Sequence, residues 1–294
     1  MIVVTGATGH VGSSLTHILL DNNQKVRVTG RNSDRLKPFS DRGAESMNGS
    51  LEDRAFLKKA FQGADRLFLM IPPHYQAEDF RAYQNRIIDA YLDAIQSSSD
   101  IHYIVTLSSL GAHHDNGTGP ILGLHDLETR MAELKDRNIV HLRPTFFMEN
   151  LLITLPMIRN SGIAGTPMRG DIEVPMIATA DIASKAADLL MGEPVSGHSI
   201  RELLGPRDYT QEEAVSFLGK ALGIDGLSYI QIPYKDAKHS MMEQGFSESV
   251  ADAMIELNKS VNEGRIIVGT TRTPANTTST TLESFISNAV KALT

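Results

Sequence analysis

The sequence of 294 residues contains no cysteine. This absence excludes disulfides, thiol catalysis and zinc sites with cysteine ligands. Long apolar runs are also missing, since none approaches the roughly 18 residues that a membrane helix requires. The apolar segment Ile2–Val4 predicts a core strand, which leaves no place for a signal peptide before it. These features favour a soluble, cytoplasmic protein that does not contact a membrane.

Basic patches are scarce as well. The chain has 28 lysines and arginines against 35 aspartates and glutamates, a formal net charge of -7 and a sequence pI of about 5.8. An acidic chain repels nucleic acid at long range, and no lysine- or arginine-rich run offsets this repulsion. Nucleic acid is therefore not expected as a direct partner.

Short β-branched segments alternate with longer amphipathic stretches through the first half of the chain. Strands are expected at 2–5, 25–29, 44–48, 66–71, 101–107 and 139–143, and helices near 11–20, 34–41, 51–61, 78–96 and 125–135. Strands of a few apolar residues that alternate with helices of ten or more are typical of a parallel sheet covered on both faces. The pattern predicts an α/β fold with a doubly wound parallel sheet.

The segment "TGATGHVG" (5–12) places three glycines directly after the first expected strand. Gly6 permits a tight turn, Gly9 lets the backbone approach a pyrophosphate, and Gly12 allows the next helix to pack closely on the sheet. The N-terminus of that helix then faces the phosphates. The context predicts a Rossmann domain that binds a dinucleotide, with contacts from Gly6, Thr8, Gly9, His10, Val11 and Gly12.

The end of the second expected strand indicates which dinucleotide is bound. An NAD enzyme usually offers a carboxylate there to the ribose hydroxyls, whereas this chain has Arg31 and, one helical turn later, Arg35. Both can meet a 2′-phosphate with charge-assisted hydrogen bonds, which predicts NADP(H); a solvated surface arginine is the alternative. By their positions after later strands, further cofactor contacts are expected from Ser50, Ile71, Pro72, Pro73 and Ser108.

Several motifs together resemble a known family. They are "TGATGHVG", "GRN" (30–32), "IPPHY" (71–75), "LSS" (107–109), "HDLE" (125–128), "LRPTFFMEN" (142–150) and "TADIA" (179–183). The set resembles the extended and atypical short-chain dehydrogenase/reductases, and in particular the NmrA-like branch with its NAD(P)H:quinone oxidoreductase and triphenylmethane reductase members. The resemblance runs over nearly the whole chain and implies a reductase that uses a nicotinamide cofactor.

The usual proton relay of short-chain dehydrogenases is missing. That relay uses a serine after the fifth strand and a Tyr-x-x-x-Lys on the following helix. Ser108 and Ser109 are present, but His125 stands near the tyrosine position and no lysine follows four residues later. The motif "YKDAK" (234–238) lies far beyond the sheet strands and is interpreted as a coincidence. Alcohol oxidation is therefore not expected, and the candidate catalytic residues are His125, Ser109 and Tyr75.

The alternation of strand and helix patterns ends after residue 145. An apolar run at 146–158 and a glycine- and proline-rich stretch at 162–175 precede "VPMI" (174–177), which is expected to rejoin the sheet with 198–205. Residues beyond 205 favour helices, with a short strand at 228–233. We predict an NADP-binding domain of residues 1–145 plus about 174–204, and a smaller, helix-rich substrate-binding domain of about 146–173 and 205–294.

Candidate substrate contacts follow from these boundaries. They are His74, Tyr75, Phe146, Phe147 and Met148. An equal alternative is that His74 and Tyr75 only close their loop, and that the other three belong to the core between the two domains. Because adjacent His113 and His114 lack a third ligand at helical spacing, no metal is expected.

Two function classes remain from the sequence. One is an NADPH-dependent reductase that transfers hydride to a small electron-poor acceptor such as a quinone or an azo or triphenylmethane dye. The other is a non-catalytic NADP(H)-binding redox sensor that acts through a protein partner. A homodimer is compatible with either class.

Overall fold

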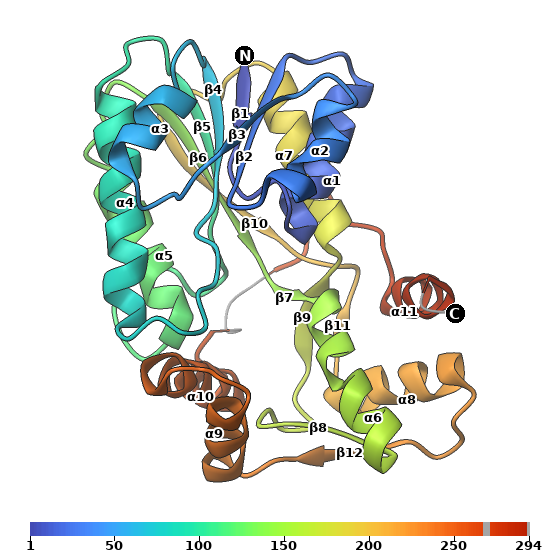
Figure 1. Ribbon diagram of the computed structural model, residues 1–294. Helices are drawn as coiled ribbons and strands as arrows, with labels where there is room; N and C mark the ends of the chain where they lie inside the picture. The colour runs from blue at the N-terminus through green and yellow to red at the C-terminus, as the bar shows by residue number, and fades with distance from the viewer. Residues whose placement is uncertain (267–270, 293–294) are drawn as a thin grey trace.

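The computed structural model describes residues 1–266 and 271–292, and its larger part is built on a seven-stranded sheet (Figure 1). All neighbouring strands of this sheet are parallel, in the order β10-β6-β5-β4-β1-β2-β3. The strands are β1 (Ile2–Val4), β2 (Val26–Gly30), β3 (Glu45–Asn48), β4 (Arg66–Leu69), β5 (Tyr103–Leu107), β6 (Asn138–Pro144) and β10 (His198–Leu203). The order reverses between β1 and β4, as in a doubly wound sheet. The predicted fold class is confirmed.

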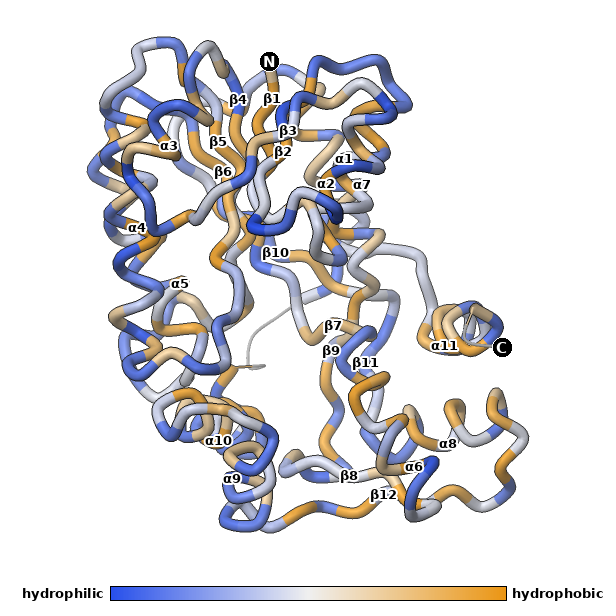
Figure 2. The backbone as a smooth tube through the Cα atoms, viewed as in Figure 1, coloured by the Kyte–Doolittle hydropathy of each residue, from blue (hydrophilic) through white to orange (hydrophobic). Residues whose placement is uncertain are grey.

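Helices cover both faces of the sheet (Figure 1). One face carries α3 (Arg54–Ala60), α4 (Phe80–Gln96) and α5 (Leu122–Met131), and the other carries α1 (His10–Asp21), α2 (Ser33–Ser40) and α7 (Thr179–Met191). The central strands are apolar while the helices alternate between apolar and polar positions (Figure 2). In α1, for example, Val11, Leu15 and Leu19 recur every four residues and are buried.

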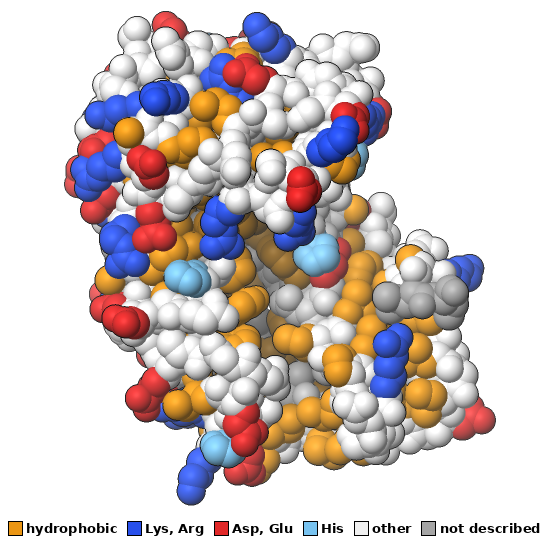
Figure 3. All heavy atoms as spheres, in the orientation of Figure 1, with side chains coloured by type: hydrophobic (Ala, Val, Ile, Leu, Met, Phe, Trp, Pro, Cys, Tyr) orange, Lys and Arg blue, Asp and Glu red, His pale blue; other side chains and the backbone are white. Residues whose placement is uncertain are grey.

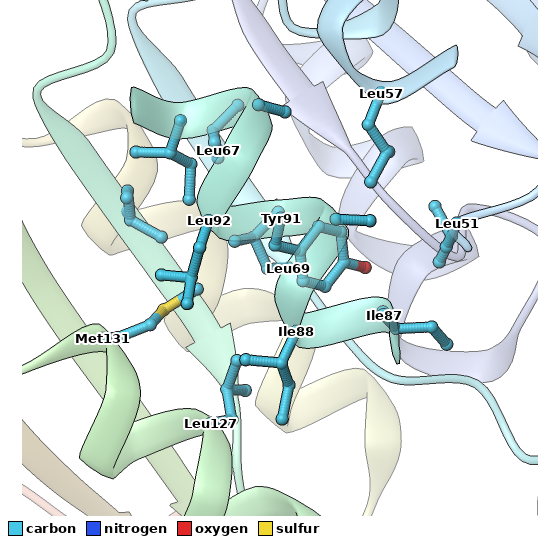
Figure 4. Close-up of a cluster of buried hydrophobic side chains, with 14 of the residues drawn as sticks. Leu51, Leu57, Leu67, Leu69, Ile87, Ile88, Tyr91, Leu92, Leu127 and Met131 are labelled. Atoms are coloured by element: carbon cyan, nitrogen blue, oxygen red, sulfur yellow. The ribbon is translucent and has the colours of Figure 1, made fainter. Parts of the chain in front are cut away.

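The core on the α4 face shows why this helix lies where it does. In Figure 4, Leu92 of α4 lies beside Met131 of α5, whereas the Tyr91 ring lies beside Leu69 of β4 and points away from Met131. Of the 17 residues of α4, ten are buried, so the helix is covered by the sheet and by α5 together. This packing fixes the connection that leads from β4 into α4.

The smaller part begins directly after β6 and contains two short sheets. Its elements are β7 (Phe146–Phe147), η2 (Met148–Thr154), α6 (Leu155–Ser161), β8 (Ile163–Thr166), β9 (Val174–Ile177), β11 (Asp208–Tyr209), α8 (Gln211–Leu222), β12 (Ser228–Gln231), α9 (Tyr234–Glu243), α10 (Glu248–Asn262) and α11 (Leu282–Lys291). The helix-rich character expected beyond residue 205 is confirmed. The domain boundaries themselves remain predictions.

The segment 174–177 does not rejoin the large sheet as the sequence indicated. It forms β9, which pairs with β7 and β11 in a three-stranded sheet, and only β10 returns to the large sheet. All four residues of β9 are buried, so the run has the composition of a core strand. Composition alone does not state which of two sheets a short apolar strand joins.

The two parts are packed together rather than linked by a single connection. Helix α10 lies beneath α4 and the short helix η1 (Gly119–Ile121), as Figure 1 shows, and the side chain of Glu256 accepts a hydrogen bond from the Gly119 amide at 3.0 Å. None of the described helices combines the length and the apolar character that a bilayer crossing requires.

Replacing Thr210 tests the start of α8. Its hydroxyl accepts from the Glu213 amide at 3.1 Å while the Glu213 carboxylate accepts from the Thr210 amide at 3.1 Å, which is a capping box. Thr210→Ala is expected to lower the free energy of unfolding by about 1 kcal/mol in urea titrations, and Thr210→Ser to retain most of it. Equal stability of all three proteins would contradict this assignment.

Candidate functional site

The glycine turn after β1 has the geometry of a phosphate site. Gly6 has φ +67°, in the left-handed region, and a Cβ on it would lie 2.5 Å from the Met70 sulfur. Gly9 is the N-cap residue of α1, and no side chain caps the helix there, so the first amides of α1 are available to an anion. A Cβ on Gly12 would lie 2.2 Å from the Gly6 carbonyl oxygen. Gly12 therefore lets the turn pack on its own helix rather than on the sheet.

The other predicted residues of the turn differ in what they present. Thr8 is half-buried and His10 is exposed, as a ligand contact requires, whereas the side chain of Val11 is buried in the core of the sheet. Val11 can meet a cofactor only through its backbone amide.

A buried threonine fixes the point where β1 and β4 end. The Thr5 hydroxyl donates to the Phe68 carbonyl at 3.0 Å and accepts from the Met70 amide at 3.0 Å. The Tyr91 phenol donates to the Met70 carbonyl at 2.6 Å. Burial raises the pKa of Tyr91, so this phenol keeps its proton and remains a donor. The carboxyl ends of the two central strands are thereby held in one position.

Two arginines follow the end of β2, and only one of them is bonded to the glycine turn. The Asn32 side chain caps α2 by accepting from the amides of Asp34 and Arg35. The Arg35 guanidinium donates to the Thr8 carbonyl at 2.7 Å and so lies across the glycine turn. Arg31 is exposed, and no ion pair holds it within residues 1–266 and 271–292. Of the two predicted 2′-phosphate contacts, Arg35 thus lies against the turn, and Arg31 follows the end of β2, the strand that pairs with β1.

The connections after β3 and β4 complete this side of the site. A Cβ on Gly49 would lie 2.3 Å from the Phe56 ring, so the chain passes close to α3 before the predicted contact Ser50. After β4, the Tyr83 phenol donates to the Pro72 carbonyl at 3.0 Å. Burial raises the pKa of Tyr83 to about 12, and the positive charge of Arg31 acts in the opposite direction. Tyr83, which the sequence did not indicate, thus holds the Pro72 carbonyl in the segment Ile71–Pro73 and lies within electrostatic reach of Arg31.

His74 and Tyr75 continue this connection as two aromatic contacts. The His74 ring meets the Tyr83 ring edge-on with centroids 5.0 Å apart, and its Nδ1 is buried without a hydrogen-bond partner in the described structure. Tyr75 is 40% exposed and stacks on Phe246, with ring centroids 4.5 Å apart. Phe246 was not indicated by the sequence because it comes from the connection between α9 and α10.

Ser108 is not available to a cofactor, which corrects the prediction made for it. It is 3% exposed, and its hydroxyl donates to the Glu128 carboxylate. The same carboxylate accepts two hydrogen bonds from Arg143, at 2.9 and 2.5 Å. Burial opposes ionisation of Glu128, but the hydrogen bonds from Arg143 and Ser108 outweigh it and keep the pKa of Glu128 below its usual value. This buried network joins the end of β5 to α5 and β6.

His125 is likewise committed to the protein. Its Nδ1 lies 3.0 Å from the Ala112 carbonyl oxygen, so Nδ1 carries the proton of the neutral ring, and Nε2 lies 3.5 Å from the Thr129 hydroxyl. The Nδ1 hydrogen of His125 is thus bonded to the Ala112 carbonyl within the protein, and the role of His125 as a proton donor stays a prediction. It lines a cavity of about 230 Å³ with His113, Glu128 and Arg143, a set that excludes the glycine turn.

The remaining predicted residues are either half-buried or part of the hydrophobic core. Ser109 is half-buried, and its hydroxyl donates to the Leu110 carbonyl at 2.9 Å. Phe146 and Phe147 are half-buried and pack against the core of the smaller part and that of the large sheet, respectively. Met148 is fully buried in the core of the smaller part, which favours the core alternative over a substrate wall for this residue.

Two motifs that the sequence analysis set aside lie away from the glycine turn. The Tyr234 hydroxyl accepts from the Asn262 side chain at 2.7 Å, and Lys238 pairs with Glu248 and Asp252. The "YKDAK" motif therefore joins α9 to α10. The rings of His113 and His114 lie 3.9 Å apart, and no group of three metal-ligating side chains occurs among the described residues.

A hollow lies below the large sheet in the space-filling view. Its walls are mainly hydrophobic, and arginine or lysine and histidine side chains stand at its upper rim (Figure 3). An apolar cleft with a few charged groups at its edge is the usual form of a site for a small organic molecule. The carboxyl ends of the parallel strands point into this region, as the topology requires.

Comparison with known proteins gives the family. Residues 1–286 match the model of the NmrA-like family. The chain belongs to this family. It is 27% identical over 259 residues to an NAD(P)H azoreductase of Xenophilus azovorans, covering 87% of this chain and 86% of that protein.

Two solved structures share the fold over nearly the whole chain. The NADPH-dependent quinone oxidoreductase of Escherichia coli complexed with NADPH has a TM-score of 0.77 at 21% identity, covering 98% of this chain and 99% of that one. The triphenylmethane reductase of Citrobacter sp. complexed with NADP(H) has a TM-score of 0.79 at 20% identity, covering 98% and 100%. The fold of this NmrA-like protein is therefore that of these reductases.

Breaking the buried network should destabilise the protein strongly. Glu128→Gln leaves the Arg143 charge buried and unpaired, so the free energy of unfolding is expected to fall by about 3–5 kcal/mol. Because the folded pKa of Glu128 is lowered, its contribution is present above the usual glutamate pKa and is lost as the pH falls through the folded value. The difference between the two proteins should therefore shrink in acid.

Urea titrations at neutral pH and near pH 3 measure both effects. Asp171→Asn is the matched control, since it breaks the exposed Arg169–Asp171 pair and should leave the midpoint unchanged. Glu128→Gln with wild-type stability at neutral pH would show that the network carries no stabilisation.

Proposed function

We propose that this protein is an NADPH-dependent reductase that transfers hydride to an electron-poor acceptor such as a quinone or an azo or triphenylmethane dye. The observation that carries the proposal is the glycine turn at the uncapped N-terminus of α1, with two arginines and no carboxylate after β2. When bound, NADPH supplies the hydride from its nicotinamide ring. The printed activities of the azoreductase, quinone oxidoreductase and triphenylmethane reductase relatives support this class.

The residues present fit a phosphorylated dinucleotide. The backbone at Gly9 leaves room for a pyrophosphate, because a Cβ there would approach only the Gly6 carbonyl oxygen, at 3.4 Å. Arg31 is free to pair with a 2′-phosphate, and Arg35 is already held over the turn by Thr8. Charge-assisted hydrogen bonds of this kind favour NADPH over NADH.

The groups around the site favour an acceptor that needs no dedicated acid. The Ser108 hydroxyl donates its hydrogen bond to Glu128, and His125 Nδ1 donates to the Ala112 carbonyl. The Tyr234 hydroxyl is bonded to Asn262, where α9 contacts α10. An electron-poor acceptor takes hydride without prior protonation, and water can supply the proton afterwards. In this proposal the partner is a small molecule, with neither nucleic acid nor membrane; a cytoplasmic location and a homodimer remain predictions from the sequence.

The cofactor preference rests on Arg31. Wild-type protein is expected to bind NADPH at least about tenfold more tightly than NADH, and Arg31→Ala should remove most of this difference. Nucleotide fluorescence titrations with both cofactors measure it. Lys25→Ala is the matched control, because Lys25 is exposed at the opposite end of β2. Equal affinities of the wild type for the two cofactors would falsify the role of Arg31.

An acceptor panel tests the reaction class. Purified protein with NADPH should oxidise the cofactor in the presence of 1,4-benzoquinone, a naphthoquinone or a triphenylmethane dye, and not with small aldehydes, whose reduction needs an acid. Loss of the near-ultraviolet absorbance of NADPH reports the turnover. Tight NADPH binding without turnover on any acceptor, with an association state that depends on the cofactor, would favour the sensor instead.

A further inference from the structure

The connection from β4 to α4 is fastened to the turn between α9 and α10. The Ser247 amide donates to the Tyr75 carbonyl at 2.8 Å, and the Ser247 hydroxyl donates to the Ala77 carbonyl at 2.5 Å. The Phe80 amide donates to the Ser249 hydroxyl at 3.0 Å. Three hydrogen bonds between segments some 170 residues apart in sequence hold this connection in one conformation. The α9–α10 turn is therefore part of the same wall as the residues after β4.

Two aromatic rings face each other where these segments meet. The planes of Tyr75 and Phe246 are inclined by 27° with centroids 4.5 Å apart, which is an offset stack. Phe246 is half-buried and packs with its other contacts against the core beneath α4. Tyr75 is 40% exposed, although one face of its ring is covered by Phe246. The exposed part of the Tyr75 ring is open to a ligand.

The position of this stack relates it to the cofactor site. Tyr75 follows Pro72 by three residues, and the Pro72 carbonyl is held by Tyr83, whose phenol lies within the electrostatic reach of Arg31. The stack thus stands on the connection that leaves β4, which is one of the two strands between which the strand order reverses. In a doubly wound sheet a ligand lies across that point.

We propose that Tyr75 and Phe246 form an aromatic platform on which a planar, electron-poor or cationic acceptor stacks. The inference rests on the reductase function proposed above and adds the two residues that would bind the acceptor. The face of a phenol ring carries partial negative charge, so it attracts the ring of a quinone and the delocalised cation of a triphenylmethane dye. Tyr75 contacts the acceptor, and Phe246 is a positioning residue that holds the Tyr75 ring.

The platform predicts that acceptor size matters. For wild-type protein the KM for 1,4-naphthoquinone should be lower than that for 1,4-benzoquinone, because the second ring adds stacking area. Tyr75→Leu and Phe246→Leu are each expected to raise the KM for the naphthoquinone about two- to tenfold and the KM for the benzoquinone by a smaller factor, because the single ring stacks over less area. The Kd for NADPH should stay close to the wild-type value in both variants, because neither ring is expected to contact the cofactor.

Conservative variants separate stacking from a structural role. Tyr75→Phe and Phe246→Tyr keep the rings and should restore the wild-type KM ratio of the two quinones. Met242→Ala is the matched control, since Met242 is 42% exposed on α9 of the same pair of helices and should change neither KM. Equal loss on both quinones together with weaker NADPH binding would show a distorted wall and would overturn the platform.

A binding measurement keeps this inference separate from the reaction. Malachite green titrated into the protein with saturating NADP⁺, followed by the dye absorbance, reports stacking without turnover. If the wild type reduces no acceptor but binds the dye two- to tenfold more tightly than Tyr75→Leu and Phe246→Leu, the reductase proposal fails and the platform stands. If the wild type reduces quinones and neither the KM ratio nor the dye affinity changes in these variants, the platform is refuted and the reductase proposal stands.

Discussion

The site depends on one buried hydroxyl. Thr5, at the end of β1, is bonded to both the carbonyl of Phe68 and the amide of Met70, so the last residues of the two central strands cannot separate without leaving buried polar groups unpaired. The glycine turn starts at the next residue, and Gly6 packs against the Met70 side chain. A phosphate site and the wall opposite it are therefore positioned by the same hydrogen bonds. Tyr91 adds the helix α4 to this arrangement through the Met70 carbonyl.

Most of the fold was predictable because its signals are local. Each strand of the large sheet is a short apolar run followed by a turn and an amphipathic helix, and this alternation permits few topologies. The sheet that receives β9 was not predictable, since its four buried residues suit either sheet and the choice depends on pairing with β7 and with β11, some thirty residues away on each side. Long-range pairing leaves no trace in the composition of the strand itself.

The same distinction separates the predicted site residues that lie at the ends of strands from those whose side chains are bonded elsewhere in the protein. The glycine turn and Arg31 follow directly from their place after a strand, and the topology brings them together. The sequence did not indicate the partners of the Ser108 and His125 side chains, because these partners are distant along the chain. Ser108 donates to Glu128, 20 residues further on, and Glu128 pairs with Arg143 on β6. Phe246 was missed because the contact with Tyr75 exists only once α9 and α10 have folded beneath α4.

Because Ser108 and His125 donate their hydrogen bonds within the protein, the site supports a limited range of reactions. For Ser108 to act as an acid, it would have to release Glu128, a buried carboxylate whose pKa is held below its usual value by the hydrogen bonds from Arg143 and Ser108. For His125, donation from Nδ1 would break its bond to Ala112. Each use would break a hydrogen bond within the protein at every turnover, and the one between Ser108 and Glu128 is buried. An acceptor that takes hydride because its own ring is electron-poor avoids that cost, and the exposed part of the Tyr75 ring is the kind of surface that such a ring binds.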